Sequence, residues 1–284
     1  MFDRCRRGRA LWHFVIGMTT AASAVGAQTG AANSRSNAVI TGRDFRILGG
    51  ATLGAAALSL FDVPIARAFA DSGLHRRWGF ESTARATSHA TETVYMLAGA
   101  SIWAVSRIGH ADAAAAVSLH LAESVAAGAS VIQVIRGFVG RARPYVIDDA
   151  GGTHDSDPYE FQILHGFTSF NYRSFPSMHA MANFAAATAL TQEMRIRNTP
   201  GRQVFGPLLY VGASAAPLAR MYLDEHWASD IALGAFLGVF AGQKVVTYSH
   251  EHPGNYVDRK LLRPEMNIGL TFDARGVSLA IRPF

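Results

Sequence analysis

The chain has 284 residues, of which 49% are hydrophobic and 17% are charged, and its formal net charge is +5. Soluble domains usually carry about 25% charged residues, so the low charge and the abundance of small residues indicate closely packed helices. Most of the positive charge lies near the N-terminus or in the motifs described below, which leaves no separate basic patch for nucleic acid.

The N-terminus has the pattern of an export signal. A basic stretch over 4–9 precedes an apolar segment over 11–24, and small residues up to Ala27 offer a cleavage site. The apolar segment is shorter than the about 20 residues that a membrane-spanning helix needs. We therefore predict a signal peptide over 1–27 and export to the periplasm or cell-envelope membrane of a bacterium.

The remaining chain predicts an all-α fold, a helical bundle. After a flexible lead-in over 28–43, rich in Ser, Gly and Asn, a helical domain is expected over 44–250. A polar loop over 145–175 interrupts it, and loops of this length are usually functional. The expected apolar or helical segments, in chain order, are 45–61, 94–105, 111–141, 177–195, a helix starting near Pro207, and 226–246.

The C-terminal extension, 251–284, has a different pattern. Residues 267–272 and 277–281 alternate between polar and apolar side chains around a turn, which predicts a β-hairpin. A lone hairpin is marginally stable, so we expect it to pack on the bundle or on a partner.

Small residues give one expected helix a face for close packing. Gly234, Gly238 and Gly242 recur every four residues in the helix over 226–246, a spacing that suits helix contacts in lipid or in a soluble bundle. None of the helices is a charge-free run of about 20 apolar residues. The sequence therefore favours a periplasmic bundle with possible membrane association over an integral membrane protein.

The first motif contains two arginines, Arg136 and Arg143, followed by Pro144. Seven residues make about two helical turns, so on one helix both side chains would share a face. Guanidinium groups donate bidentately to phosphate oxygens. The alternative is a solvated basic helix end that complements the helix dipole, and we expect the nearby Arg141 to have that simpler role.

The second motif, Pro176-Ser177-Met178-His179, stands where a loop enters a helix. Free N–H groups at such a position bind an anion. Ser177 can cap the helix or donate its hydroxyl to the ligand, and His179 is close enough to protonate a leaving oxygen. An ordinary N-cap with a polar neighbour explains the same residues.

The third motif places His226 and Asp230 four residues apart, with Arg220 six residues before the histidine. On one helix face Asp230 would accept from one imidazole nitrogen and leave the other free to attack. Arg220 can complete a cationic cradle, although a surface pair at this spacing is also common. Asp224 and Glu225 would suit a metal ion, but the nearby arginines would repel a cation, so we predict no metal.

The other histidines carry less information. His120 lies on an apolar helix and is expected to be a satisfied core residue, and His250 and His252 are expected to be solvated. His154 and His165 lie in the long loop, where contact with a substrate is possible but has no further support.

Together and in this order, the three motifs resemble the signature of the type 2 phosphatidic acid phosphatase (PAP2) family. That family shares its site with bacterial class A acid phosphatases and vanadium haloperoxidases. Its pattern is Lys-x6-Arg-Pro, Pro-Ser-Gly-His and Ser-Arg-x5-His-x3-Asp, and the resemblance covers roughly 90–248. It implies a bundle with the site at one end, in which His226 forms a phosphohistidine, Asp230 orients it and His179 is the acid. By the same resemblance, phosphate would be held by Arg136, Arg143, Arg220, Ser177 and the backbone of Met178.

Three positions depart from the family pattern. Arg136 replaces a lysine, which keeps the charge but changes the donor shape. Met178 replaces a glycine, which would cost strain if that position had a positive φ. Ala219 replaces a serine and removes one hydroxyl. The nucleophile, acid and orienting carboxylate are all retained.

The resemblance implies a metal-independent phosphatase that hydrolyses phosphate monoesters or lipid (di)phosphates at the cell envelope, without a cofactor. One alternative is a haloperoxidase, in which the same residues would hold vanadate as the cofactor. A second is a non-catalytic protein that binds phosphate or lipid headgroups. The expected partner is a phosphorylated small molecule or lipid, not nucleic acid, and the oligomeric state is not predicted.

Overall fold

The computed structural model describes residues 40–70, 81–146, 157–262, 266–273 and 276–283. The predicted signal peptide and most of the lead-in lie outside these residues, and the domain boundaries stay predictions. The long helices are α2 (Gly42–Ser59), α6 (Glu92–Ile108), α7 (Asp112–Val139), α9 (Met178–Ile196), α10 (Arg202–Tyr222) and α11 (Ala228–Glu251). The short elements are α3 (Asp62–Phe69), α5 (Glu81–Thr87), α8 (His165–Thr168), a 3-10 turn (Phe170–Tyr172) and α12 (Tyr256–Leu261).

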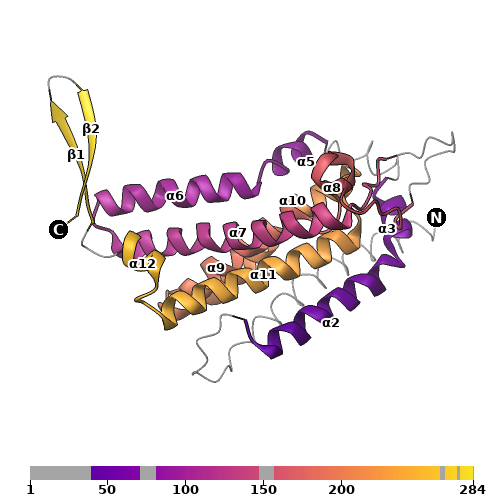
Figure 1. Cartoon of the computed structure of the whole chain (residues 1–284), viewed down its shortest axis with the longest axis horizontal. Helices are drawn as coiled ribbons and strands as arrows, with labels where there is room; N and C mark the ends of the chain where they lie inside the picture. Colours follow the sequence, from indigo (N-terminus) through magenta and orange to yellow (C-terminus); the bar gives the residue numbers. More distant parts are fainter. Residues whose placement is uncertain (1–39, 71–80, 147–156, 263–265, 274–275, 284) are drawn as a thin grey trace.

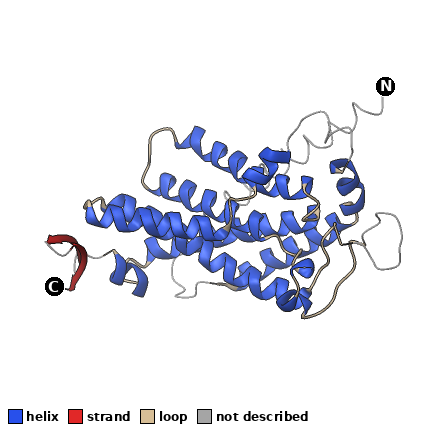
Figure 2. Ribbon diagram, turned by 90° about the horizontal axis from the view of Figure 1, so that it is seen from above, coloured by secondary structure: helices blue, strands red, loops and turns tan. Residues whose placement is uncertain are grey.

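The long helices lie side by side, and the fold of the bundle is helical as predicted (Figures 1 and 2). Helix α9 is at the centre and contacts α7, α10 and α11. Most of its side chains are small or apolar on every face, and Met181, Phe184 and Ala185 are fully buried. A helix that is apolar on every side belongs in a core, which explains why α9 lies inside the bundle.

The glycines of α11 allow it to approach the backbone of α9. A Cβ atom added to Gly238 would lie 2.3 Å from the Met181 carbonyl oxygen, and one added to Gly234 would lie 2.4 Å from that of Ser177. The expected packing face is therefore the α9–α11 interface. This contact holds the N-termini of the two helices together at one end of the bundle.

Gly238→Ala is expected to destabilise the protein by about 1–3 kcal/mol, the usual cost of overpacking, because the new methyl group would meet a backbone atom that cannot move aside. Gly212→Ala is the control, since a Cβ there has nothing within 4 Å and alanine favours a helix by up to about 1 kcal/mol. Denaturant unfolding of both variants tests this. Equal midpoints for the two variants would contradict the close α9–α11 approach.

Helix boundaries differ from the expected ones where a glycine decides them. Helix α7 ends at Val139, not at Arg141, because Gly140 adopts the left-handed conformation (φ 58°) and its N–H caps the Arg136 carbonyl. Helix α10 begins at Arg202, ahead of Pro207, after the left-handed Gly201 (φ 76°).

The C-terminal strands β1 (Met266–Asp273) and β2 (Gly276–Pro283) pair antiparallel. They project away from the helices instead of lying along them (Figure 1), which differs from the expected packing on the bundle. The all-α class is confirmed for the bundle, whereas a stable hairpin stays a prediction, since two strands alone are marginal.

Among the described residues, two helices are long and apolar enough to cross a membrane, namely α7 and α11. The pair α2–α3, bent by 63°, passes the same test together and would raise the number to three. The preference for a periplasmic bundle with possible membrane association over an integral membrane protein is therefore weakened, and a membrane location gains support.

Candidate active site

The three motifs meet at the end of the bundle where α7 ends and where α9 and α11 begin. Arg143 follows α7, His179 is in the first turn of α9, Arg220 is in the last turn of α10, and His226 precedes α11. The rings of His179 and His226 face each other edge-on with centroids 6.4 Å apart. The helices α3, α5 and α8 gather around this end (Figure 1).

His226 is 3% exposed, and its Nδ1 lies 3.7 Å from Oδ2 of Asp230. The distance allows an ion pair but is too long for a hydrogen bond, and Nδ1 has no hydrogen-bond partner. We expected the two residues to share a helix face. This expectation is wrong, because α11 begins only at Ala228 and His226 lies before it. Asp230 instead caps that helix by accepting from the Trp227 N–H (2.8 Å).

The Asp230 carboxylate is held in place by donors from several segments. It is fully buried, and it accepts from the Arg141 guanidinium at 2.6 Å and the Ser174 hydroxyl at 2.5 Å in addition to the Trp227 N–H. With its other lone pairs used, Asp230 has one orientation toward His226. At 3.7 Å its charge can stabilise positive charge on the imidazole, although no hydrogen bond fixes the ring.

Arg141 is central to this arrangement, and the expectation that it is a solvated helix end is wrong. Its side chain is 2% exposed. It bonds to Asp62 (2.7 Å), Asp230 (2.6 Å), the Ser229 hydroxyl (2.8 Å) and the Pro158 carbonyl (2.8 Å). Asp62 also accepts from the Ser229 N–H and hydroxyl. A buried ion-pair network thus connects α3, the segment after α7 and α11.

Arg143 and Arg220 converge on one carboxylate. Arg143 is 2% exposed and pairs with Oε2 of Glu225 at 2.5 Å, and Arg220 pairs with the same oxygen at 2.8 Å. Nε of Arg220 is buried without a partner, and Arg143 also stacks on Phe170 at 4.1 Å. Two guanidinium groups around one carboxylate oxygen form an anion site that a phosphate group can enter by displacing Glu225.

Arg136 is not brought into this pair. It lies within α7 and bonds to Gln133 one turn away, through Nε at 2.9 Å and through a terminal nitrogen. The expectation of a helix face shared with Arg143 is wrong, because Gly140 ends the helix between them. Among the described residues no hydrogen bond or ion pair joins Arg136 to the two other motifs, so its phosphate-binding role stays a prediction.

In the second motif, Ser177 caps a helix and Met178 packs in the core. Ser177 is the N-cap of α9, and its hydroxyl accepts from the Ala180 N–H at 3.3 Å. Met178 is 4% exposed, has an ordinary helical φ and packs among Val125, Ile132 and other core side chains. Methionine at this position therefore costs no left-handed strain, and its side chain fills the core.

The electrostatics keep both imidazoles neutral at ordinary pH. Burial lowers the pKa of His226 to about 4, and the positive charges of Arg143 and Arg220 add to the effect while Asp230 opposes it. Burial also lowers the pKa of His179 to about 3, together with the charges of Arg220 and His226. A neutral His226 has a lone pair for attack, whereas His179 needs an additional proton before it can act as an acid.

Nε2 of His179 lies 3.1 Å from the Ser88 carbonyl oxygen, to which it can donate when protonated. In the neutral ring this bond places the hydrogen on Nε2, so Nδ1 carries the lone pair. Asn183 supports the same turn, because it donates to the carbonyls of His179 and Ala90, both at 2.9 Å.

Several residues of the site had no signal in the sequence. Asp62, Ser174 and Ser229 are single polar residues with no motif around them, and only their burial shows their importance.

Of the other histidines, His165 stacks on Tyr172 with centroids 5.2 Å apart, and His154 lies outside the described residues. His120 is buried as expected, whereas His250 bonds to Glu193 and is not simply solvated.

The comparisons with known proteins agree with the motifs. Residues 117–252 match the model of the PAP2 superfamily. The chain is also 32% identical over 117 residues to the lipid A 1-phosphatase of Porphyromonas gingivalis, an alignment that covers 38% of this chain and 25% of the relative. The chain thus spans about a quarter of the length of that curated relative. No solved structure matches the chain significantly. The predicted resemblance is confirmed over residues 117–252, which match the PAP2 superfamily model.

Proposed function

We propose that this protein is a phosphatase that hydrolyses phosphate monoesters or lipid phosphates at the cell envelope, through a phosphohistidine on His226 and without a catalytic metal. The observation that carries the proposal is the meeting of two neutral imidazoles, the buried His226 and the half-buried His179, beside two arginines that share one anion site. Binding a phosphate requires only the arginines. The second histidine and the buried Asp230 are explained by catalysis.

The proposed reaction has two steps. Nε2 of His226 attacks phosphorus, the ester P–O bond breaks, and His179 passes a proton from the bound phosphate monoanion to the leaving oxygen. Water then attacks the phosphohistidine, His179 takes a proton of that water and returns it to the phosphate, and His226 and inorganic phosphate are released. Arg143 and Arg220 stabilise the negative charge on the phosphoryl oxygens in both transition states. Asp230 compensates the positive charge that develops on His226.

The surface of the bundle favours a lipid substrate. Large apolar side chains are exposed on the four helices α2, α6, α7 and α10, and exposed apolar surface marks sites of contact with a membrane or a partner. They include Phe45, Leu53, Leu97, Ile102, Val105, Val131, Val134, Phe138, Phe205, Leu208 and Val211. The likeness to a lipid A 1-phosphatase points in the same direction. We infer that these helices contact the membrane and that the substrate is presented from it.

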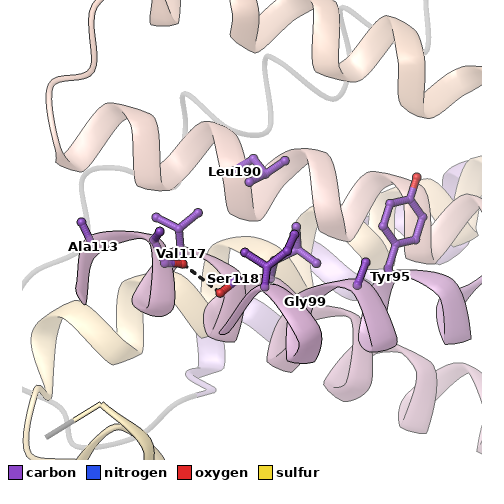
Figure 3. A pocket seen from close by; sticks show the side chains of 10 residues that line it. Tyr95, Gly99, Ala113, Val117, Ser118 and Leu190 are labelled. Atoms are coloured by element: carbon purple, nitrogen blue, oxygen red, sulfur yellow. Dashed lines mark hydrogen bonds between the residues drawn. The ribbon is translucent and has the colours of Figure 1, made fainter. Parts of the chain in front are cut away.

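An apolar groove of about 360 Å³ between α6 and α7 offers a place for an acyl chain (Figure 3). It extends from Ala113 to Tyr95, with Leu190 of α9 above it. The Tyr95 hydroxyl donates to Asn183, one helical turn from His179. One end of the groove therefore lies close to the proposed acid.

A panel of phosphate-release assays with EDTA present tests the proposal. We expect turnover of lipid phosphates to exceed that of a soluble aryl phosphate, and vanadate to inhibit as a mimic of the five-coordinate transition state.

The substitution Ala98→Trp replaces an exposed side chain of the groove lining with one that fills the groove. It should lower the rate with the lipid substrate and leave the rate with the aryl ester unchanged. Activity that disappears with EDTA and returns with a divalent ion would refute the mechanism. Bromide oxidation with vanadate and peroxide would instead identify a haloperoxidase.

The pKa values predict an acidic optimum. Activity should rise with pH through about 4, because His226 must lose its proton to attack. It should fall above about pH 6, the second pKa of a phosphate ester, because a His179 with a pKa near 3 must take its proton from the bound monoanion. A profile of kcat/KM against pH at constant ionic strength measures both limbs. An optimum at pH 8 or above would contradict this assignment.

A further inference from the structure

A second group of titratable side chains lies at the opposite end of the bundle, where the mechanism uses none of them. It consists of His120 on α7, Glu193 on α9, His250 on α11 and Asp258 on α12. At 1.5 Å per residue, about 20 Å of helix α9 separates Glu193 from His179. The cluster is therefore not an extension of the candidate active site.

The hydrogen bonds of this cluster assign the tautomer of His120. Its side chain is buried, and Nδ1 lies 2.6 Å from Oε1 of Glu193. Glu193 also bonds to Nε2 of His250 at 2.8 Å and to Nε of Arg197 at 2.7 Å. In a neutral imidazole Nδ1 is then the donor, and Nε2 carries a lone pair.

That lone pair points at a second acceptor. Nε2 of His120 lies 3.4 Å from Oδ1 of Asp258. Both atoms are buried, and neither has a hydrogen-bond partner. The other oxygen of Asp258 accepts from Asn255 at 2.8 Å. Two buried acceptors facing each other repel unless a positive charge lies between them.

The separation fits a metal ion. Ligand atoms about 2.0–2.1 Å from a tetrahedral Zn²⁺ ion lie about 3.4 Å apart. Glu123 is one turn after His120 on α7, and one ligand atom from each of His120, Glu123 and Asp258 lies within 4.8 Å of the others. Glu123 is half-buried, so the position stays accessible to an ion and to a water ligand.

We propose that His120, Glu123 and Asp258 bind a divalent transition-metal ion of the Zn²⁺ class. The imidazole ligand favours such an ion over Mg²⁺ or Ca²⁺. Glu193 holds the other nitrogen of the ring, as outer carboxylates do for zinc-bound histidines. The ion joins α12 to α7 and has a structural role, separate from phosphate chemistry.

The competing state is a protonated His120 that donates to both Glu193 and Asp258. Burial lowers the pKa of His120, but the two carboxylates raise it to about 9, which favours this state when no ion is bound. Metal binding by the full chain distinguishes the two. The protein is prepared with a tag that lacks histidine, dialysed against chelator, and titrated with Zn²⁺ by calorimetry. The variants are Glu123→Gln and Asp258→Asn, and the control is Glu251→Gln, an exposed carboxylate at the end of α11.

We expect one Zn²⁺ per chain in the wild type and in Glu251→Gln, and at least about tenfold weaker binding in the two ligand variants. Zn²⁺ should raise the Tm of the wild type and not that of Glu123→Gln. No uptake by the wild type, equal uptake by Glu123→Gln, or tighter binding of Ca²⁺ than of Zn²⁺ would overturn the proposal. Because the readouts are metal content and Tm, the result does not depend on phosphatase activity, which is expected to persist in EDTA below the Tm.

Discussion

His226→Ala is expected to lower kcat/KM toward phosphate esters by at least about 10⁴-fold, the scale of losing a catalytic nucleophile. In the proposed mechanism no other described imidazole attacks the phosphate held by Arg143 and Arg220, since His179 is assigned the role of the acid. The fold should remain, because His226 precedes α11 and its Nδ1 makes no hydrogen bond. Steady-state rates, circular dichroism and a melting curve on the purified variant measure both parts of the expectation.

The covalent intermediate gives the same prediction a second readout. Rapid quenching of the wild type with a labelled substrate should trap a phosphoenzyme that is stable in base and labile in acid, and His226→Ala should trap none. His250→Ala is a matched control, since that imidazole lies at the other end of the bundle and its loss should leave the label in place. Undiminished turnover in His226→Ala would show that another group attacks phosphorus.

The motifs predicted the location of the site better than its local geometry. Their order and their positions at helix ends predicted that Arg143, His179, Arg220 and His226 would meet, and the structure places them together. The reason is topological: in an antiparallel bundle, the end of one helix lies beside the start of the next. Which residues meet depended on the order of the helices and on the approximate positions of their ends, and the sequence indicated both.

The arguments from helix faces failed where the helix is interrupted. Gly140 separates Arg136 from Arg143, and α11 starts too late to include His226. Spacing within a helix is informative only when the helix is continuous between the two residues. Gly140 is a typical C-terminal signal, so this boundary was available from the sequence.

Buried contacts over long sequence distances had no such signal. Arg141 and Asp62 are 79 residues apart, and a lone arginine beside a helix end is usually solvated. The resemblance implied that the backbone of Met178 holds phosphate, which stays a prediction, but it did not show that the Met178 side chain packs in the core. In both cases tertiary packing determines the role, and a single sequence does not show which side chains are buried together.

Arg141→Met is expected to destabilise the protein by about 3–5 kcal/mol, the cost of breaking a buried ion pair by removing one partner. The methionine keeps the apolar stem but leaves the carboxylates of Asp62 and Asp230 buried without their cation. Arg85→Met is the control, because its pair with Glu81 is exposed on both sides and such pairs contribute about 0–1 kcal/mol. Denaturant unfolding in the same detergent or buffer gives both values.

A second substitution separates the charge from the packing. If the loss in Arg141→Met comes from uncompensated carboxylates, adding Asp62→Asn should recover part of it, because one of the two buried charges is then removed. The double variant should still be nearly inactive, since Asp230 would remain without the donor that holds it toward His226. A loss in Arg141→Met no larger than in Arg85→Met, or no recovery in the double variant, would show that shape and not charge makes Arg141 necessary.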